Sequence, residues 1–340
     1  MTTYPSSPQS SNNDDTTTTT CSQQKRSISR LKALVLIICG VFLAGPTLLL
    51  VYTLLYQGYR TIDPTRFPSP PAQLMATIKN AGETTDSKAK GAALMAATYA
   101  ELQRELDSPF GWSINDLFFS PTRWLDNRNA RQRGVLFATR MLTQFFSTHY
   151  AKLGASDAEN KLLKECREKR LVYGEDVWGF FRPSVESEYR IAIKLMKSYE
   201  TDLLAGRAIF NMRTDDIYNT LVFLLSEEIL GQTLGLLVQP NSEVPYHDLD
   251  ERIYYAQGVV LVVRDFLFAL IQLFPETTQK GGKTNIEMAF TELNNICTFD
   301  PIIVLRGDHD SLLADHRGKL ATYLVPAMKR INDLTQSIRR

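Results

Sequence analysis

A run of 24 uncharged residues, from Ala33 to Tyr56, constrains this chain more than any other feature of its sequence. At about 1.5 Å per residue, an α-helix of this length crosses the roughly 30 Å hydrocarbon layer of a bilayer. A cleavable signal peptide has an apolar region of only about 7–15 residues. This run is longer and follows a tail of 32 residues. The sequence therefore predicts an uncleaved transmembrane helix over residues 33–56.

Charged residues on either side of this run predict its orientation. Lys25, Arg26, Arg30 and Lys32 precede it, whereas only Arg60 and Arg66 follow closely, with Asp63 between them. Because basic flanks stay on the cytoplasmic side, we expect residues 1–32 to form a cytoplasmic tail with a basic collar. This tail is rich in Ser and Thr and is expected to be disordered. Residues 57–72 then form a proline-rich spacer beyond the membrane, and membrane lipid is a direct partner.

The balance of charges excludes one class of function. The chain has 38 Lys and Arg residues against 37 Asp and Glu residues, a formal net charge of +1. Nucleic-acid binding depends largely on the neutralisation of phosphates by excess basic residues, so we expect no nucleic-acid partner. Cys166 and Cys297 lie in the exported part. One disulfide bond and two buried thiols are both compatible with their positions.

Beyond the spacer, apolar residues recur every three or four positions, which is the spacing of α-helices. We therefore predict an all-α fold in which an N-terminal transmembrane helix is followed by a multi-helix domain over residues 73–340. At this length a single core is near its usual limit. Two lobes with a seam near residues 206–214 are compatible with that size.

A second apolar stretch, from Tyr254 to Phe274, tests the single-span topology. Arg264 and Asp265 stand at its centre, where each charge would cost roughly 2.5–3.5 kcal/mol in a membrane helix. We interpret this stretch as a buried core helix that carries the two charges on its outer side.

The last predicted helix starts near Ser311 and has apolar residues in a near-heptad pattern. They are Leu313, Leu320, Leu324, Ala327, Ile331, Leu334 and Ile338. Fewer than four uninterrupted heptads favour packing onto the domain over self-association.

The densest polar cluster precedes this last helix and contains Asp308, His309, Asp310 and His316. Imidazole and carboxylate groups supply metal ligands and proton acceptors, so Asp308, His309 and Asp310 are candidate metal ligands. Asp308, His309 and His316 are candidate catalytic groups. The two histidines are seven positions apart, or about 10 Å along a helix, and cannot share an ion if both are helical. The alternative is structural, with Asp310 capping the final helix.

Aromatic and arginine residues gather between residues 110 and 182. Those of greatest interest are Trp112, Arg123, Trp124, Arg128, Arg131 and Trp178. Trp and Arg dominate the energetics of protein interfaces, so these residues are candidates for a partner-binding surface. The alternative is that the aromatic side chains fill a core between helices. Glu175 and Asp176 are weak candidates for the acids of a glycosidase, since adjacent helical carboxylates point apart.

Three segments carry a family resemblance: SPFGWSINDLFFSPTRWLDNRNARQRGVLFATR, GEDVWGFFRPSVESEYR and CTFDPIIVLRGDHDSLLADHRGKLATYL. They resemble a proteobacterial family of uncharacterised, membrane-anchored proteins classed as a domain of unknown function. The resemblance covers most of the chain from the predicted span to the C-terminus. It implies a single-pass protein of the Gram-negative inner membrane with a periplasmic domain. It brings no catalytic residue, cofactor or substrate.

These observations favour a periplasmic scaffold or an accessory subunit of a cell-envelope complex, with an envelope protein or a second copy as its partner. The combination of an anchor with aromatic and arginine residues, and without a catalytic motif, favours a role other than catalysis. The alternatives are an anchored enzyme acting on cell-wall or lipid material, and a metal-binding domain that uses the Asp308–His316 cluster. We expect no cofactor.

Overall fold

The computed structural model describes residues 69–109, 111–115, 126–154, 158–177, 179, 181–275, 282–301, 304–307 and 313–339, together with seven residues between 40 and 55. The chain divides into two compact units, Met1–Ile62 and Asp63–Arg340. The predicted tail and most of the predicted spacer lie outside the described residues. All seven described residues of the predicted membrane span are helical and exposed.

In its described part, the second unit consists of helices and has no strand, which confirms the predicted all-α fold. The α-helices are α2 (Ala72–Gly82), α3 (Ser87–Asp107), α4 (Asp126–Phe145), α5 (Lys161–Glu165), α6 (Val185–Leu204), α7 (Thr214–Leu225), α8 (Leu230–Val238), α9 (Leu249–Leu273), α11 (Lys283–Cys297) and α12 (His316–Arg339). Short 3₁₀ turns are η2 (Ser113–Asn115), η6 (Asn241–Glu243) and η7 (Tyr246–Asp248). The π-helical turns η4 (Phe146–Tyr150) and η5 (Cys166–Arg170) extend α4 and α5.

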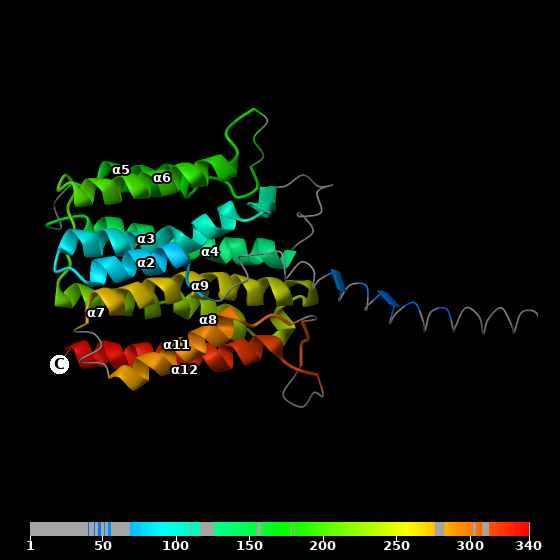
Figure 1. The fold of residues 1–340 in the computed structure, drawn as a ribbon. Helices are drawn as coiled ribbons and strands as arrows, with labels where there is room; N and C mark the ends of the chain where they lie inside the picture. Colours follow the sequence, from blue (N-terminus) through cyan, green and yellow to red (C-terminus); the bar gives the residue numbers. More distant parts are fainter. Residues whose placement is uncertain are drawn as a thin grey trace, which may run out of the picture. The chain divides into compact units, whose positions relative to one another are not determined.

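Helix α9 lies at the centre of this unit. It packs against α2, α3, α4, α8, α11 and α12 (Figure 1). Helices α5 and α6 cover α3 on one side, and α11 and α12 form the opposite layer. One contiguous hydrophobic core contains residues from all of these helices and continues across residues 206–214, the predicted seam.

Within the described residues, two helical stretches are long and apolar enough to cross a membrane by length and composition, Asp215–Val238 and Tyr246–Leu273. The first is interrupted between α7 and α8. The second contains α9, and 89% of its most apolar part is buried inside the protein. This burial supports the interpretation of residues 254–274 as a core helix. The expected outward position of its charges is wrong, because Arg264 and Asp265 are only 2% and 0% exposed.

The apolar face of α12 is also buried in the domain. Its buried members are Leu320, Leu324, Ala327, Ile331, Leu334 and Ile338, and α12 contacts α7, α8, α9 and α11. Leu313 precedes the helix and is exposed. The near-heptad pattern therefore reflects packing within one chain.

Two glycines allow α4 and α9 to touch backbone to backbone. A Cβ atom on Gly134 would lie 2.1 Å from the Tyr255 carbonyl oxygen, and one on Gly258 would lie 2.1 Å from the Arg131 carbonyl oxygen. No side chain fits at such distances. Glycine at both positions therefore sets the separation of the two helices.

We expect Gly258→Ala to lower the free energy of unfolding by about 2–3 kcal/mol, because the added methyl group must force α4 away from α9. Gly235→Ala is the matched control, since Gly235 lies inside α8 with nothing within 4 Å of an added Cβ. This control should raise the stability by about 0.5–1 kcal/mol. Urea unfolding followed by circular dichroism measures both, and equal effects would contradict the proposed contact.

Candidate functional site

Four ionisable side chains meet in the core where α3 packs against α9. Glu101 and Arg104 come from α3, and Arg264 and Asp265 come from α9. Positions three apart lie on the same side of a helix, so Glu101 and Arg104 face α9 together. Glu101, Arg264 and Asp265 are buried, and Arg104 is nearly so. Buried charges are expensive unless they are paired.

Each carboxyl group of this cluster is paired with an arginine. Arg104 Nε donates to Glu101 Oε2 at 3.0 Å, and its Nη2 contacts the other carboxylate oxygen. Arg264 donates from Nε and Nη2 to Asp265 Oδ1 at 2.9 and 2.7 Å. The Glu101 and Asp265 carboxyl groups also act on each other, since each shifts the pKa of the other. Because two ionised carboxylates repel each other in a buried site, the pair is more stable with one proton bound.

Asp265 is the member of the pair that holds this proton. Burial, reinforced by the Glu101 charge, raises the pKa of Asp265 well above its usual range. Burial opposes ionisation of Glu101 as well, but Arg104 and the contact with Asp265 lower its pKa.

The cluster consequently carries more positive than negative charge. Glu101 contributes the only negative charge among its four members, against the guanidinium groups of Arg104 and Arg264. Burial raises the pKa of the neighbouring Cys297 to about 11, so its thiol is neutral. Cys166 and Cys297 are both buried and free. Of the two arrangements compatible with the sequence, the structure therefore has the two buried thiols.

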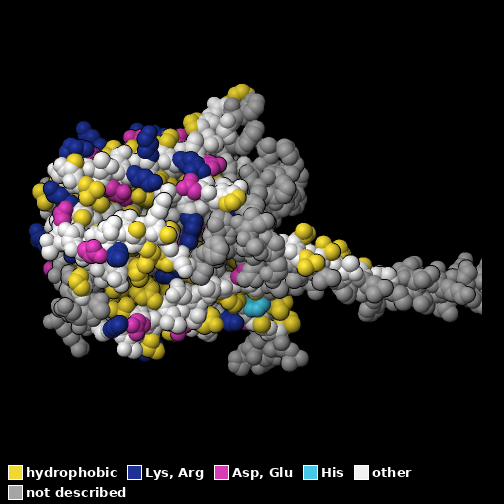
Figure 2. Space-filling view, viewed as in Figure 1, with side chains coloured by type: hydrophobic (Ala, Val, Ile, Leu, Met, Phe, Trp, Pro, Cys, Tyr) yellow, Lys and Arg dark blue, Asp and Glu magenta, His cyan; other side chains and the backbone are white. Residues whose placement is uncertain are grey.

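A cavity of about 480 Å³ lies beside Arg264, between α2, α9 and α11. Its polar lining includes Arg264 and Asn294, and Arg264 Nη1 donates to Asn294 Oδ1 at 3.3 Å. Most of the remaining wall is apolar and includes Phe268 and Phe290. Figure 2 shows hydrophobic side chains gathered on this face of the unit.

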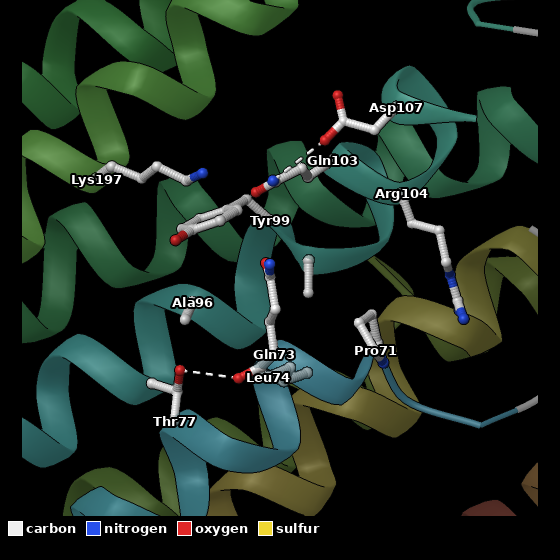
Figure 3. A pocket seen from close by; sticks show the side chains of 11 residues that line it. Pro71, Gln73, Leu74, Thr77, Ala96, Tyr99, Gln103, Arg104, Asp107 and Lys197 are labelled. Atoms are coloured by element: carbon white, nitrogen blue, oxygen red, sulfur yellow. Dashed lines mark hydrogen bonds between the residues drawn. The ribbon is translucent and has the colours of Figure 1, made fainter. Parts of the chain in front are cut away.

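A second cavity, of about 230 Å³, lies between α2 and α3 and is closed on one side by Lys197 of α6 (Figure 3). Arg104 lines it and donates from Nη1 to the Ser69 carbonyl oxygen at 2.9 Å. Behind it, the Tyr99 hydroxyl donates to Glu200 Oε2 at 3.2 Å. Burial raises the pKa of Glu200 to about 7. The charge cluster thus separates two cavities.

The structure corrects the predicted partner-binding surface. Trp112 is buried, donates its indole N–H to the Glu175 carbonyl oxygen at 3.0 Å, and packs edge-on against Tyr189. Arg128 and Arg131 are buried too, because both pair with Glu105 of α3, at 3.2 and 2.9 Å. These three residues stabilise the interior and cannot form a surface. The other predicted members, Arg123, Trp124 and Trp178, lie outside the described residues.

The predicted catalytic and metal-binding residues are not brought together where the structure describes them. Glu175 pairs with Arg133 at the surface, 3.3 Å away, and Asp176 is exposed. His316 begins α12, and its Nδ1 accepts the Leu305 N–H at 2.9 Å. Asp308, His309 and Asp310 lie outside the described residues. Within the described part, no three His, Cys, Asp or Glu side chains are grouped to hold a metal ion.

Asp315 accepts a hydrogen bond from the first turn of α12, which begins at His316 and not near Ser311 as expected. Its Oδ1 accepts the Gly318 N–H at 3.0 Å. Arg317, one residue into the helix, is buried and donates to the Gln239 carbonyl oxygen and to Asn241 Oδ1. The described part of this polar segment therefore joins α12 to the connection after α8.

The described residues of the loop between η5 and α6, which are 171–177, 179 and 181–184, project beyond the helices (Figure 1). Hydrogen bonds hold its base: Val185 N–H donates to the Val177 carbonyl oxygen at 3.1 Å, and the Tyr173 hydroxyl donates to the Pro183 carbonyl oxygen at 3.0 Å. Phe181 of this loop is 94% exposed. This loop presents an aromatic side chain on an ordered base.

Comparison with protein families matches residues 32–239 to the family described as "Uncharacterized protein conserved in bacteria (DUF2333)". The match covers more than half of the chain and includes the predicted membrane span and helices α2 to α8. Neither a curated protein nor a solved structure matches the chain.

The protonation of the cluster can be tested by substitution. Asp265→Asn replaces a protonated carboxyl group with a group of the same shape and should cost less than about 1 kcal/mol near pH 5. As the pH rises above the ordinary carboxyl pKa, the folded protein keeps a proton that the unfolded chain loses. The stability of the natural protein should then fall relative to the variant. Urea unfolding between about pH 5 and about pH 8 measures this difference.

Glu101→Gln is the comparison variant, because it removes the negative partner of Arg104. We expect it to cost about 3–5 kcal/mol throughout this range. Greater damage from Asp265→Asn than from Glu101→Gln would show that the proton resides on Glu101 instead.

Proposed function

The chain belongs to the bacterial family DUF2333, and from that premise we propose that it is a membrane-anchored scaffold or accessory subunit of the cell envelope. In this proposal residues 33–56 anchor it in the inner membrane, with the N-terminus in the cytoplasm and the helical domain in the periplasm. The loop at residues 171–184 binds an envelope protein or a second copy of the chain.

Exposed leucines support the anchor. Leu48, Leu54 and Leu55 lie in helical backbone and are 69%, 63% and 70% exposed. Apolar side chains exposed along a helix are unfavourable in water but suit the interior of a bilayer. The basic residues that precede the run, and the sparser ones that follow it, support the orientation.

The exposure of Phe181 is the single observation that carries the binding role. Aromatic side chains contribute a large share of binding energy at protein interfaces. A base that is already held by hydrogen bonds lowers the entropy lost when such a loop binds. Arg182, next in the chain, is exposed as well, and arginine is enriched at interfaces. This site replaces the wider surface that the sequence predicts.

The binding role can be tested by site-specific photo-crosslinking in cells. A photo-crosslinking phenylalanine at position 181 should give a discrete adduct with one protein, while the same group at Leu204 should give none. Leu204 is a matched control because it is apolar, 61% exposed and at the opposite end of α6. Phe181→Ala should abolish co-purification of that protein and leave the melting temperature unchanged. Equal crosslinking from both positions would contradict the proposal.

The topology can be tested with the natural cysteines. A maleimide that cannot cross membranes should label Cys21 of the full chain only after the inner membrane is permeabilised. A cysteine at the exposed Ser69 should be labelled in intact spheroplasts. Cys166 and Cys297 are buried and should stay unlabelled in the folded protein. Labelling of Cys21 in intact spheroplasts would overturn the orientation.

A further inference from the structure

We propose that the cavity between α2, α9 and α11 binds a small amphiphile, with an anionic carboxylate head against Arg264 and Asn294 and an apolar chain or ring against the surrounding wall. This ligand site is separate from the loop at residues 171–184 and does not depend on it.

The floor of the cavity provides the first argument. Arg264 and Asn294 both line the space, so a guanidinium group and an amide face the same volume. Guanidinium N–H groups bind carboxylates strongly, through charge-assisted hydrogen bonds. Arg264 is only 2% exposed, and at such a site a charge interaction is screened far less than at the surface.

The charge of the cluster provides the second argument. Among the described residues, Asp265 is the carboxyl group that pairs directly with Arg264, and burial beside Glu101 raises its pKa so that it holds a proton. Glu101 in turn pairs with Arg104. Among the described residues, the positive charge of Arg264 is therefore left without a full counter-charge. An anion in the cavity would compensate for it, whereas a cation would be repelled.

The wall of the cavity provides the third argument and defines the rest of the ligand. Phe268 and Phe290 pack edge to face there, with ring centroids 5.9 Å apart, and Ile286 and Met75 extend the apolar surface. The volume of about 480 Å³ lies within the roughly 300–1,000 Å³ that is typical of ligand pockets. At the rim, Lys283 and Glu287 form an exposed ion pair, 3.7 Å apart. A polar rim, an apolar wall and a cationic floor match a molecule with one anionic end.

The test uses the full chain in lipid nanodiscs and two soluble probes of the same shape, 4-phenylbutanoate and 4-phenylbutanol. Saturation-transfer difference NMR, with empty nanodiscs as the blank, gives the dissociation constant of each probe. We expect saturable binding of the carboxylate that is at least about tenfold tighter than that of the alcohol, because only the carboxylate pairs with Arg264. Equal binding of both probes, or no saturable binding of the carboxylate, would overturn the proposal.

Two variants locate the bound probe without removing the buried arginine. Thr291→Phe places a ring in the cavity from an exposed position on α11 and should weaken carboxylate binding by more than about tenfold. Thr201→Phe is the matched control, since Thr201 is also exposed and also donates to the carbonyl oxygen four residues earlier, on α6. It should change binding by less than about twofold.

Asn294→Ala should reduce the preference for the carboxylate over the alcohol, and an unchanged preference would exclude the assigned head-group position.

Discussion

The backbone contact between α4 and α9 is the constraint on which the rest of the domain depends. At Gly134 and Gly258 there is no room for a side chain, so the two helices can adopt only one separation and one register. That register fixes the positions from which the side chains of Arg128 and Arg131 extend from α4. Both side chains pair with Glu105 on α3. Helix α3 is thereby positioned against α9, and Glu101 meets Asp265. A loss of the glycine contact would disturb the buried charged contacts of Glu105 and Glu101.

Helix α3 carries two buried acids, and each serves a different neighbour. Glu105 binds arginines of α4, while Glu101 faces α9, and the two are one helical turn apart. Buried ion pairs contribute little net stability, since desolvation offsets most of their attraction. They do penalise any displacement that would leave a charge alone in the core. These ion pairs therefore select one arrangement of α3, α4 and α9 among the many arrangements that would bury a similar apolar area.

Much of the fold could be predicted from the sequence because helical periodicity is a local property. The all-α class, the burial of residues 254–274 and the packing face of α12 all follow from the spacing of apolar residues. The spacing of apolar residues could not show which side of α9 meets the charged residues of α3, because α9 is apolar on all sides. Arg264 and Asp265 were therefore expected outside, although Glu101 and Arg104, three positions apart on an alanine-rich helix, were the available signal of buried partners.

Site residues were harder to predict, for a related reason. A cluster of tryptophan and arginine residues looks the same in the sequence whether the side chains face solvent or fill a core. The pairing of Arg128 and Arg131 with Glu105 depends on tertiary structure, which the sequence spacing does not show. Trp112 was predicted at a partner-binding surface, but it is buried and its indole N–H holds the backbone of Glu175 within the projecting loop. The adjacent acids Glu175 and Asp176 do not form a catalytic pair, because Glu175 forms an ion pair with Arg133.

The two buried thiols have a consequence for how this domain folds where disulfides are present. Burial raises the pKa of Cys166 to about 12 and that of Cys297 to about 11, and the thiolate is the form that attacks a disulfide. Once the helices have closed over them, these cysteines exchange with disulfides extremely slowly. Only the unfolded chain presents these two thiols in a reactive form. Fast formation of the helical core therefore protects Cys166 and Cys297 from wrong disulfide bonds.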